Sequence, residues 1–222
     1  MKAVFESIII FIMILFISAC TTLQSQTEFQ SLGKLMPREA IVLLSNLEDA
    51  QHFDDRDIDE CLGFPMRQAH PELLFISAKK FRENLYPYFM PSTTPRSLDG
   101  YKSIFEKAEV QQRIDALGVR YLVMMVKSGT ITDWHGGILC GAGYGGGGCL
   151  GLSWWDRKSD FGLVIWDLRD RQRVGKIEAK AAGTGIMPAF GLPIPLYTPA
   201  TETAVCKDIG RRLANCLTDR ER

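Results

Sequence analysis

Hydrophobic residues in the first half of the chain recur with the spacings of alternating strands and helices. Short runs that are apolar throughout indicate buried strands, and a run that is apolar on both faces indicates a strand inside a sheet. Apolar residues three to four positions apart indicate amphipathic helices, one capped by a serine and one ended by a glycine. The predicted strands are 41–44, 73–76 and 120–126, and the predicted helices begin after Ser77 and cover 98–108 and 110–117, before Gly118.

The second half of the chain changes to the pattern of antiparallel strands. Residues 161–166 and 174–182 flank a polar turn and predict a hairpin, with 151–155 as a further partner strand. After a proline-rich loop, Thr198 and Pro199 form the N-cap and first-position pair of a C-terminal helix. The predicted fold class is therefore α+β: a mixed sheet with a βαβαα-type first half, an antiparallel hairpin and a C-terminal helix.

The N-terminus has the layout of a secretory signal. A basic start precedes an uncharged segment, residues 7–19, which ends in small residues. Its last residues and the cysteine that follows, Ile17–Cys20, resemble the lipobox of bacterial lipoproteins. This resemblance implies cleavage between Ala19 and Cys20, which removes the signal peptide 1–19. It also implies a covalent diacylglycerol and an N-acyl chain such as palmitate on Cys20.

An uncleaved membrane-spanning helix is the alternative for this segment. Its unbroken apolar run, residues 8–17, would cover about 15 Å as a helix, which is about half of the ~30 Å hydrocarbon core. Stable anchoring takes more than one acyl chain, and a triacylated Cys20 supplies them. We therefore expect cleavage and lipidation. By resemblance to the sorting rule of lipoproteins, Thr21 implies the periplasmic face of the outer membrane of a Gram-negative bacterium.

Composition predicts a tether and one globular domain. Residues 20–38 are mostly polar and indicate a flexible tether behind the lipidated cysteine, followed by a single periplasmic domain over 39–222. The 26 basic and 26 acidic side chains balance, so no basic field is present for nucleic acid. A hydrophobic content of 46% is that of a globular protein. Nucleic acid is therefore excluded as a partner, and the membrane is reached through the lipid anchor.

Six cysteines in an exported chain predict disulfides. Cys140 and Cys149 bracket a glycine-rich segment and are the favoured pair. Cys61 with Cys206 or with Cys216 is the second expectation. Cys206 and Cys216 lie on one predicted helix, about 15 Å apart, which is too far for a disulfide.

The segment from Gly136 to Gly151 is the most unusual stretch of the chain. It holds nine glycines in sixteen residues but has neither the Lys-Ser/Thr pair nor the following helix that a phosphate-binding loop needs. Nucleotide binding is therefore not expected, and a hairpin loop is the simplest interpretation. Aromatic residues that suit wet interfaces flank or lie within it and form a candidate contact surface with a partner or a membrane. They are Trp134, Tyr144, Trp154 and Trp155.

Residues capable of catalysis or metal binding do not form a recognisable motif. His135 and Cys140 are close in sequence, but nothing orients them as a base and a nucleophile. The remaining histidines, His52 and His70, are scattered, so no metal site and no cofactor is expected. The acidic stretch 48–60, which includes Asp54 and Asp57, fits a solvated loop that runs into a helix N-terminus better than a calcium loop or a carboxylate pair of a glycosidase. No catalytic residue is predicted, and the chain is not expected to be an enzyme.

Two segments carry a family resemblance. The helix-to-strand step at 118–123 and the hairpin formed by 164–167 and 174–178 resemble the N-terminal domain of TolB and related accessory domains of envelope lipoproteins. That group includes the curli-secretion pore lipoproteins and the lipoprotein activators of peptidoglycan synthases. The resemblance spans roughly residues 40–218 and implies a binding or assembly role, by analogy of fold.

Three functions follow as hypotheses. The first is a lipid-anchored periplasmic accessory protein that binds or helps assemble another envelope component, an unknown envelope protein. The second is a subunit of an oligomeric outer-membrane secretion or pore assembly that places its glycine-rich hairpin in the bilayer. Against the second, a membrane hairpin needs strands of about 10 residues with alternating polarity. The third is a hydrolase of envelope polymers.

Overall fold

The computed structural model describes most of the chain beyond residue 20. Expectations for the signal peptide, for the cleavage site, for the lipidation of Cys20 and for His52 lie outside the described residues. None of the helices formed by the described residues is long and apolar enough to cross a membrane. The described residues are 21–29, 32–45, 54–90, 93–95, 97–144 and 146–218.

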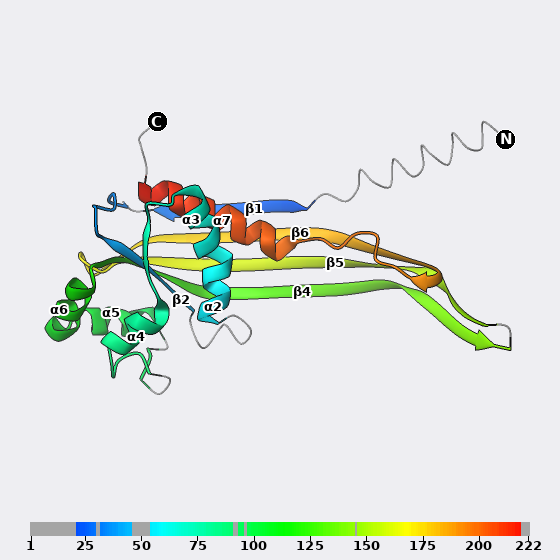
Figure 1. Ribbon diagram of the computed structural model, residues 1–222, viewed down its shortest axis with the longest axis horizontal. Helices are drawn as coiled ribbons and strands as arrows, with labels where there is room; N and C mark the ends of the chain where they lie inside the picture. The colour runs from blue at the N-terminus through cyan, green and yellow to red at the C-terminus, as the bar shows by residue number, and fades with distance from the viewer. Residues whose placement is uncertain are drawn as a thin grey trace. The chain divides into compact units, whose positions relative to one another are not determined.

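The fold is α+β, as predicted from the sequence, with a mixed six-stranded sheet and a C-terminal helix (Figure 1). The strand order is β1-β6-β5-β4-β2-β3, so β4 is an interior strand, which confirms the prediction for 120–126. Strand β2 runs parallel to β3 and to β4. The strands are β1 (Thr22–Phe29), β2 (Ala40–Ser45), β3 (Leu74–Ile76), β4 (Val119–Gly143), β5 (Gly146–Asp167) and β6 (Gln172–Pro193). The helices are α2 (Asp55–Ile58), the π-helical turn η1 (Asp59–Gly63), α3 (Phe64–Ala69), α4 (Ala78–Asn84), α5 (Leu98–Phe105), α6 (Ala108–Leu117) and α7 (Thr201–Thr218).

The helices of the first half begin and end where their capping residues predict. The Ser77 side chain accepts from the Lys80 backbone N–H at the start of α4, and Gly118 ends α6 in the left-handed region at φ 69°. Asp54 and Asp57 form a capping box at the start of α2, so these carboxylates satisfy a helix N-terminus.

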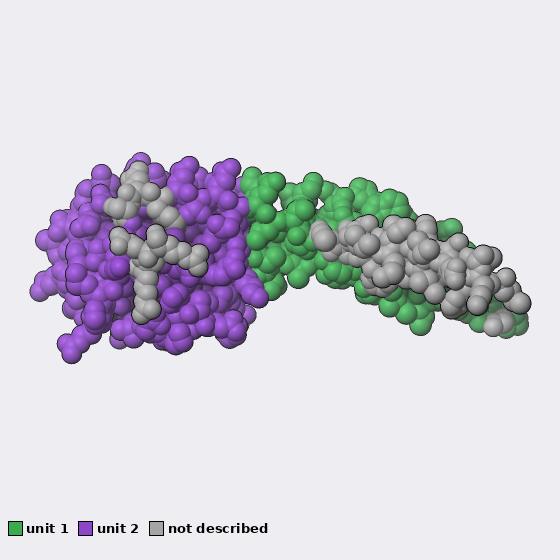
Figure 2. All heavy atoms as spheres, turned by 90° about the horizontal axis from the view of Figure 1, so that it is seen from above, with its two compact units in different colours: residues 1–24, 130–159, 180–204 green, residues 25–129, 160–179, 205–222 purple. Residues whose placement is uncertain are grey.

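The chain divides into two compact units (Figure 2). Strands β4, β5 and β6 each contribute residues to both units. Unit 1 comprises Met1–Gln24, Thr130–Ser159 and Lys180–Ala204, and unit 2 comprises Ser25–Gly129, Asp160–Ala179 and Val205–Arg222.

Unit 2 holds the main hydrophobic core. Helices α4, α5 and α6 contribute to it together with residues of β2, β4 and β5, and the Phe105 and Trp166 rings meet edge to face at 5.7 Å. Elsewhere in unit 2, a disulfide between Cys61 and Cys206 ties η1 to α7. Gly210 of α7 lies close to α3, because a Cβ there would stand only 3.0 Å from Pro65. The hydrophobic core, the close approach of α7 to α3 and one disulfide therefore hold the helices of this unit.

Three segments expected to be tether or loop belong to strands. Residues 22–29, expected within the flexible tether 20–38, form strand β1, because the sheet offers an open edge beside β6. The proline-rich segment continues β6 as far as Pro193, and α7 begins at Thr201, two residues after the expected first position.

The third segment is the glycine-rich stretch 136–151, which was expected to be a hairpin loop. It continues β4 and β5 almost to the hairpin turn. These strands pair through backbone hydrogen bonds, which need few side chains. Gly151 has φ 153°, and a Cβ there would stand 2.3 Å from the Gly137 carbonyl oxygen. At this position a side chain would prevent the close approach of the two strands.

Candidate functional site

Unit 1 contains a surface without formal charge. The segments 134–155 and 181–201 contain no Asp, Glu, Lys or Arg, although such residues make up 23% of the chain. Both segments lie within unit 1. We refer to the exposed residues of these two segments as the charge-free surface.

Large hydrophobic side chains are concentrated on the same unit. Of the seventeen that are exposed among the described residues, twelve belong to unit 1 and ten to the charge-free surface. Single exposed hydrophobic residues are ordinary, but a group of this size on one unit makes these segments the candidate for an interaction surface. The ten are Trp134, Leu139, Tyr144, Leu150, Leu152, Trp154, Phe190, Leu192, Ile194 and Leu196.

Two tryptophans pack together where β4 and β5 pair. The rings of Trp134 and Trp155 lie 4.7 Å apart, and Trp155 is only 6% exposed. Gly185 of β6 makes room for the Trp155 indole, because a Cβ there would stand 2.2 Å from the ring. Trp155 was expected to be a contact residue, but it is buried beneath the charge-free surface and packs against Trp134. Trp134, at 60% exposure, reaches solvent.

A polar group borders the charge-free surface. His135 stacks on Trp154 with ring centroids 6.0 Å apart, and its Nε2 lies 3.5 Å from Asp156 Oδ2. Thr184 Oγ1 donates to Asp156 Oδ1 at 2.6 Å. Asp156 thus joins β4 and β6 at the point where charge reappears in the sequence.

The hairpin tip carries the disulfide that the sequence favoured, between Cys140 and Cys149. Because both sulfurs are in the disulfide, Cys140 offers no thiol to act with His135 as a nucleophile. Tyr144, at the turn between the two strands, is fully exposed. Among the described residues, no three His, Cys, Asp or Glu side chains come together as metal ligands would.

The start of the described chain also belongs to unit 1. Thr21 Oγ1 lies 3.3 Å from the Tyr197 hydroxyl, and Thr22 Oγ1 donates to the Ala182 carbonyl at 3.3 Å. The residue that follows Cys20 is therefore held against the segments that form the charge-free surface.

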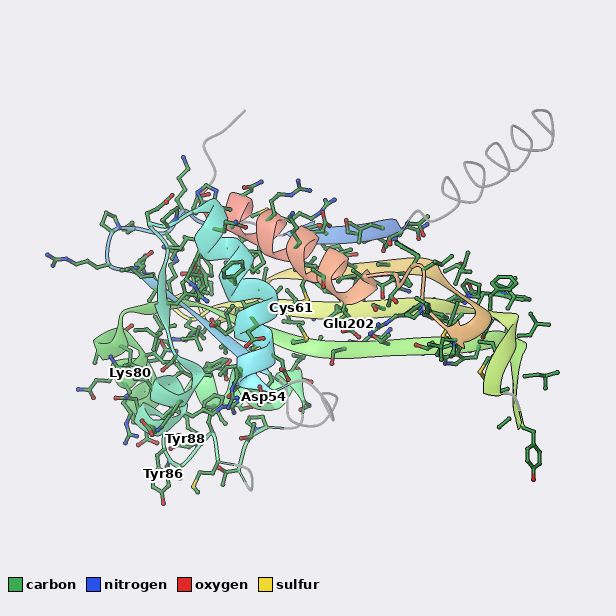
Figure 3. The ribbon with its side chains drawn as sticks, turned by 45° about the vertical axis from the view of Figure 1, so that its right-hand side comes forward. Asp54, Cys61, Lys80, Tyr86, Tyr88 and Glu202 are labelled. Atoms are coloured by element: carbon green, nitrogen blue, oxygen red, sulfur yellow. A yellow bond between two sulfur atoms is a disulfide. The ribbon has the colours of Figure 1, made fainter. Side chains whose placement is uncertain are left out.

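A hydrogen-bonded network around Glu202, which is labelled in Figure 3, fastens the start of α7 to the strands of unit 1. Glu202 accepts from Thr130 Oγ1 at 2.7 Å and from Arg157 Nη2 at 2.8 Å, and Ser159 lies within hydrogen-bond distance of both Thr130 and Thr201. Burial alone would raise the pKa of Glu202, but the hydrogen bonds from Thr130 and Arg157 outweigh it and hold that pKa below its ordinary value. These residues are distant in sequence, and no sequence pattern indicated them.

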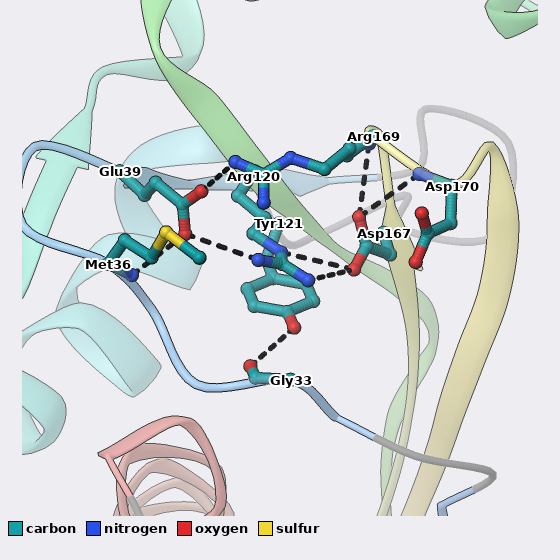
Figure 4. Close-up of polar contacts among 8 residues, drawn as sticks. All are labelled: Gly33, Met36, Glu39, Arg120, Tyr121, Asp167, Arg169 and Asp170. Carbon is teal, nitrogen blue, oxygen red and sulfur yellow. Dashed lines mark hydrogen bonds and ion pairs between the residues drawn. The ribbon is translucent and has the colours of Figure 1, made fainter.

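Unit 2 contains a second network, which is buried (Figure 4). Arg120 donates to Asp167 Oδ2 through Nε at 3.1 Å and Nη2 at 3.0 Å, and its Nη1 lies 3.4 Å from Glu39 Oε2. Burial disfavours charge on Arg120, but the hydrogen bond to Asp167 and the nearby carboxylates still raise its pKa. Glu39 also pairs with Arg169, so four charged side chains from three segments hold one another in place.

Tyr121 extends this network to the segment before β2. Its hydroxyl donates to the Gly33 carbonyl at 2.6 Å. Burial, reinforced by the Asp167 carboxylate, raises the pKa of Tyr121 to about 12. The bonds of the network all join segments of the fold, so we regard it as structural. Glu39 also lines a pocket of about 470 Å³ beside residues 34–38.

The remaining candidates occupy separate places. His70 Nδ1 lies 3.0 Å from Glu72 Oε1, and its Nε2 lies 3.3 Å from Asn215 Oδ1. Cys216 lies on α7, half-buried, and takes part in neither disulfide. Both residues belong to unit 2, whereas His135 belongs to unit 1.

Comparison with known proteins gives a distant likeness of fold. No protein-family profile and no curated protein sequence matches the chain. A solved structure described as a PelC dodecamer from Paraburkholderia phytofirmans aligns with a TM-score of 0.41 and 10% identity, covering 91% of this chain and 100% of that one. A point variant of the same protein in another crystal form aligns with a TM-score of 0.40 and 10% identity, covering 90% and 100%. A likeness at this level does not assign a function.

Proposed function

We propose that the protein is a lipid-anchored, non-catalytic subunit of an outer-membrane assembly, and that the charge-free surface of unit 1 seats it against the bilayer. The observation that carries this proposal is the position of that surface. Among the described residues it is the part richest in exposed large hydrophobic side chains, and Thr21, which follows the expected lipidation site, is hydrogen-bonded to Tyr197 of the same segments. Acyl chains on Cys20 would bring this unit to the membrane.

The hairpin has the length that contact with a bilayer needs. Its charge-free parts are residues 134–143 of β4 and 146–155 of β5, and both are regular strands. A strand of about 9–11 residues matches the thickness of a bilayer core, so both strands have the length that a membrane hairpin needs. Tryptophan and tyrosine are also the side chains that favour the boundary between lipid and water.

Quenching by brominated lipid tests the bilayer contact. The acylated protein is placed on vesicles with and without brominated acyl chains, and tryptophan emission is compared. Trp134 and Trp154 are exposed, whereas Trp155 and Trp166 are buried, so quenching is expected and should be lost in a Trp134→Phe/Trp154→Phe variant. Equal emission on both kinds of vesicle would refute the contact.

Self-association is tested separately. The two similar structures are described as dodecamers, which is a property of those proteins. For this chain, light scattering of the acylated protein in mild detergent is expected to give a particle of many subunits. A monomer would refute the assembly of identical subunits.

The second candidate is an accessory protein that binds a different envelope protein. Depletion of charge is also typical of the centre of protein–protein interfaces, so the same surface fits such a partner. A monomer in detergent, together with no quenching by brominated lipid, would favour this candidate.

A further inference from the structure

The tip of the β4–β5 hairpin is held together by one covalent bond. A Cβ built on Gly141 or Gly143 would meet no atom within 4 Å, and one on Gly147 or Gly148 would first meet atoms of Gly141, Ala142 or Gly191 only, so little side-chain packing fixes the strand ends here. The Cys140–Cys149 disulfide closes this end of the hairpin. It is therefore the main constraint on the order of the tip, beside the backbone ladder.

The two disulfides differ in their access to solvent. Cys61 is only 6% exposed and lies between η1 and α7, and its partner Cys206 is half-buried. Cys140 is exposed and Cys149 is half-buried, and neighbouring glycines leave the approach open. A thiolate must reach a sulfur atom before exchange can occur, so access favours the hairpin disulfide.

We propose that the Cys140–Cys149 disulfide is a thiol–disulfide exchange site for a dithiol, and that its redox state sets the order of the hairpin tip. One thiolate of the dithiol attacks Cys140 Sγ, the bond between the two cysteines breaks, and Cys149 leaves as a thiolate and takes a proton. The second thiol then attacks the mixed disulfide and releases Cys140. Two electrons pass to the protein, and the dithiol becomes a disulfide.

Reduction changes only the end of the charge-free surface. Residues 141–144 and 146–148 lose their covalent closure, and Tyr144 loses its fixed position between two closed strands. The Cys61–Cys206 bond keeps η1 joined to α7 in unit 2. Control of bilayer contact by this switch rests on the proposed function, whereas the exchange itself does not.

Timed alkylation tests the exchange. The acylated, oxidised protein is treated with a small excess of dithiothreitol, samples are trapped with iodoacetamide, and peptides are mapped by mass spectrometry. Cys140 and Cys149 are expected to become alkylated at least about tenfold faster than Cys61 and Cys206. Equal rates, or faster labelling of Cys61, would overturn the assignment.

Amide hydrogen exchange tests the structural consequence. The reduced protein and a Cys140→Ser/Cys149→Ser variant are both expected to exchange faster over 137–152 than the oxidised protein, with unit 2 unchanged. Unchanged exchange over 137–152 would refute the control of order at the tip. Neither experiment uses lipid vesicles. Selective reduction of the hairpin disulfide without quenching by brominated lipid would therefore refute the proposed function alone. Quenching without selective reduction would refute this inference alone.

Discussion

Replacing Gly185 by alanine tests whether unit 1 is organised around its paired tryptophans. A Cβ at this position would stand 2.2 Å from Cε2, 2.4 Å from Cζ2 and 2.6 Å from Nε1 of Trp155. Carbon atoms in contact prefer about 3.5–4.0 Å, so the indole would have to move by more than about 1 Å. Trp155 is buried against Trp134, so this movement would disturb the pair as well. Overpacking of this kind costs about 1–3 kcal/mol, which is the expected loss in the free energy of unfolding.

The matched control is Gly137→Ala, on β4 of the same unit. A Cβ at Gly137 would meet no atom within 4 Å, so the variant is expected to keep or gain up to about 1 kcal/mol. Urea unfolding followed by tryptophan emission measures both variants, and only Gly185→Ala should also change the native emission. If Gly185→Ala unfolds at the same urea concentration as the parent protein with unchanged emission, the indole does not lie over Gly185 and the reasoning is refuted.

Two further predictions concern ion pairs of unit 2. Asp167→Asn is expected to lower the free energy of unfolding by about 3–5 kcal/mol, because the side chains of Asp167 and Arg120 are only 2% and 11% exposed and the substitution leaves a buried guanidinium without its main partner. Thermal unfolding measures this loss. An equal effect of Asp170→Asn, at an exposed neighbouring carboxylate, would contradict it. Burial would raise the pKa of Asp55, but hydrogen bonds from Arg82 and Ser45 outweigh it and hold that pKa below 3.8. The stability that this depressed pKa provides is therefore present above pH 3.8 and is lost as pH falls through the lower folded-state value. Asp55→Asn should unfold more easily than the parent protein at pH 7, and its stability should depend less steeply on acid pH. Stability profiles of the two proteins that run parallel over acid pH would contradict this.

Local sequence patterns predicted the elements of unit 2 well. The apolar run at 41–44 became β2, the helix caps at Ser77 and Gly118 are in place, and the run 120–126 lies in the interior of the sheet. In each case the signal is carried by neighbouring residues, because burial on a fixed period and a satisfied helix end are local properties. These features need no knowledge of the distant chain.

The sequence was less informative where distant segments decide the structure. Nothing local in residues 22–29 or in the glycine run 136–151 favours a strand, because the pairing partner supplies the hydrogen bonds that form it. The choice of Cys206 over Cys216 for Cys61 likewise depends on how α7 packs against η1. The absence of charge over 134–155 and 181–201 was visible in the sequence and was the signal that could have located the candidate site.

Photocrosslinking in whole cells from a photoreactive residue at Tyr144 tests the central claim most directly. Tyr144 is fully exposed at the hairpin turn, and Gln172, an exposed residue of unit 2, provides the matched position. Mass spectrometry of the crosslinked products is expected to find phospholipid at residue 144 and none at residue 172. Capture of protein without lipid at residue 144, or equal capture of lipid at both positions, would contradict the account.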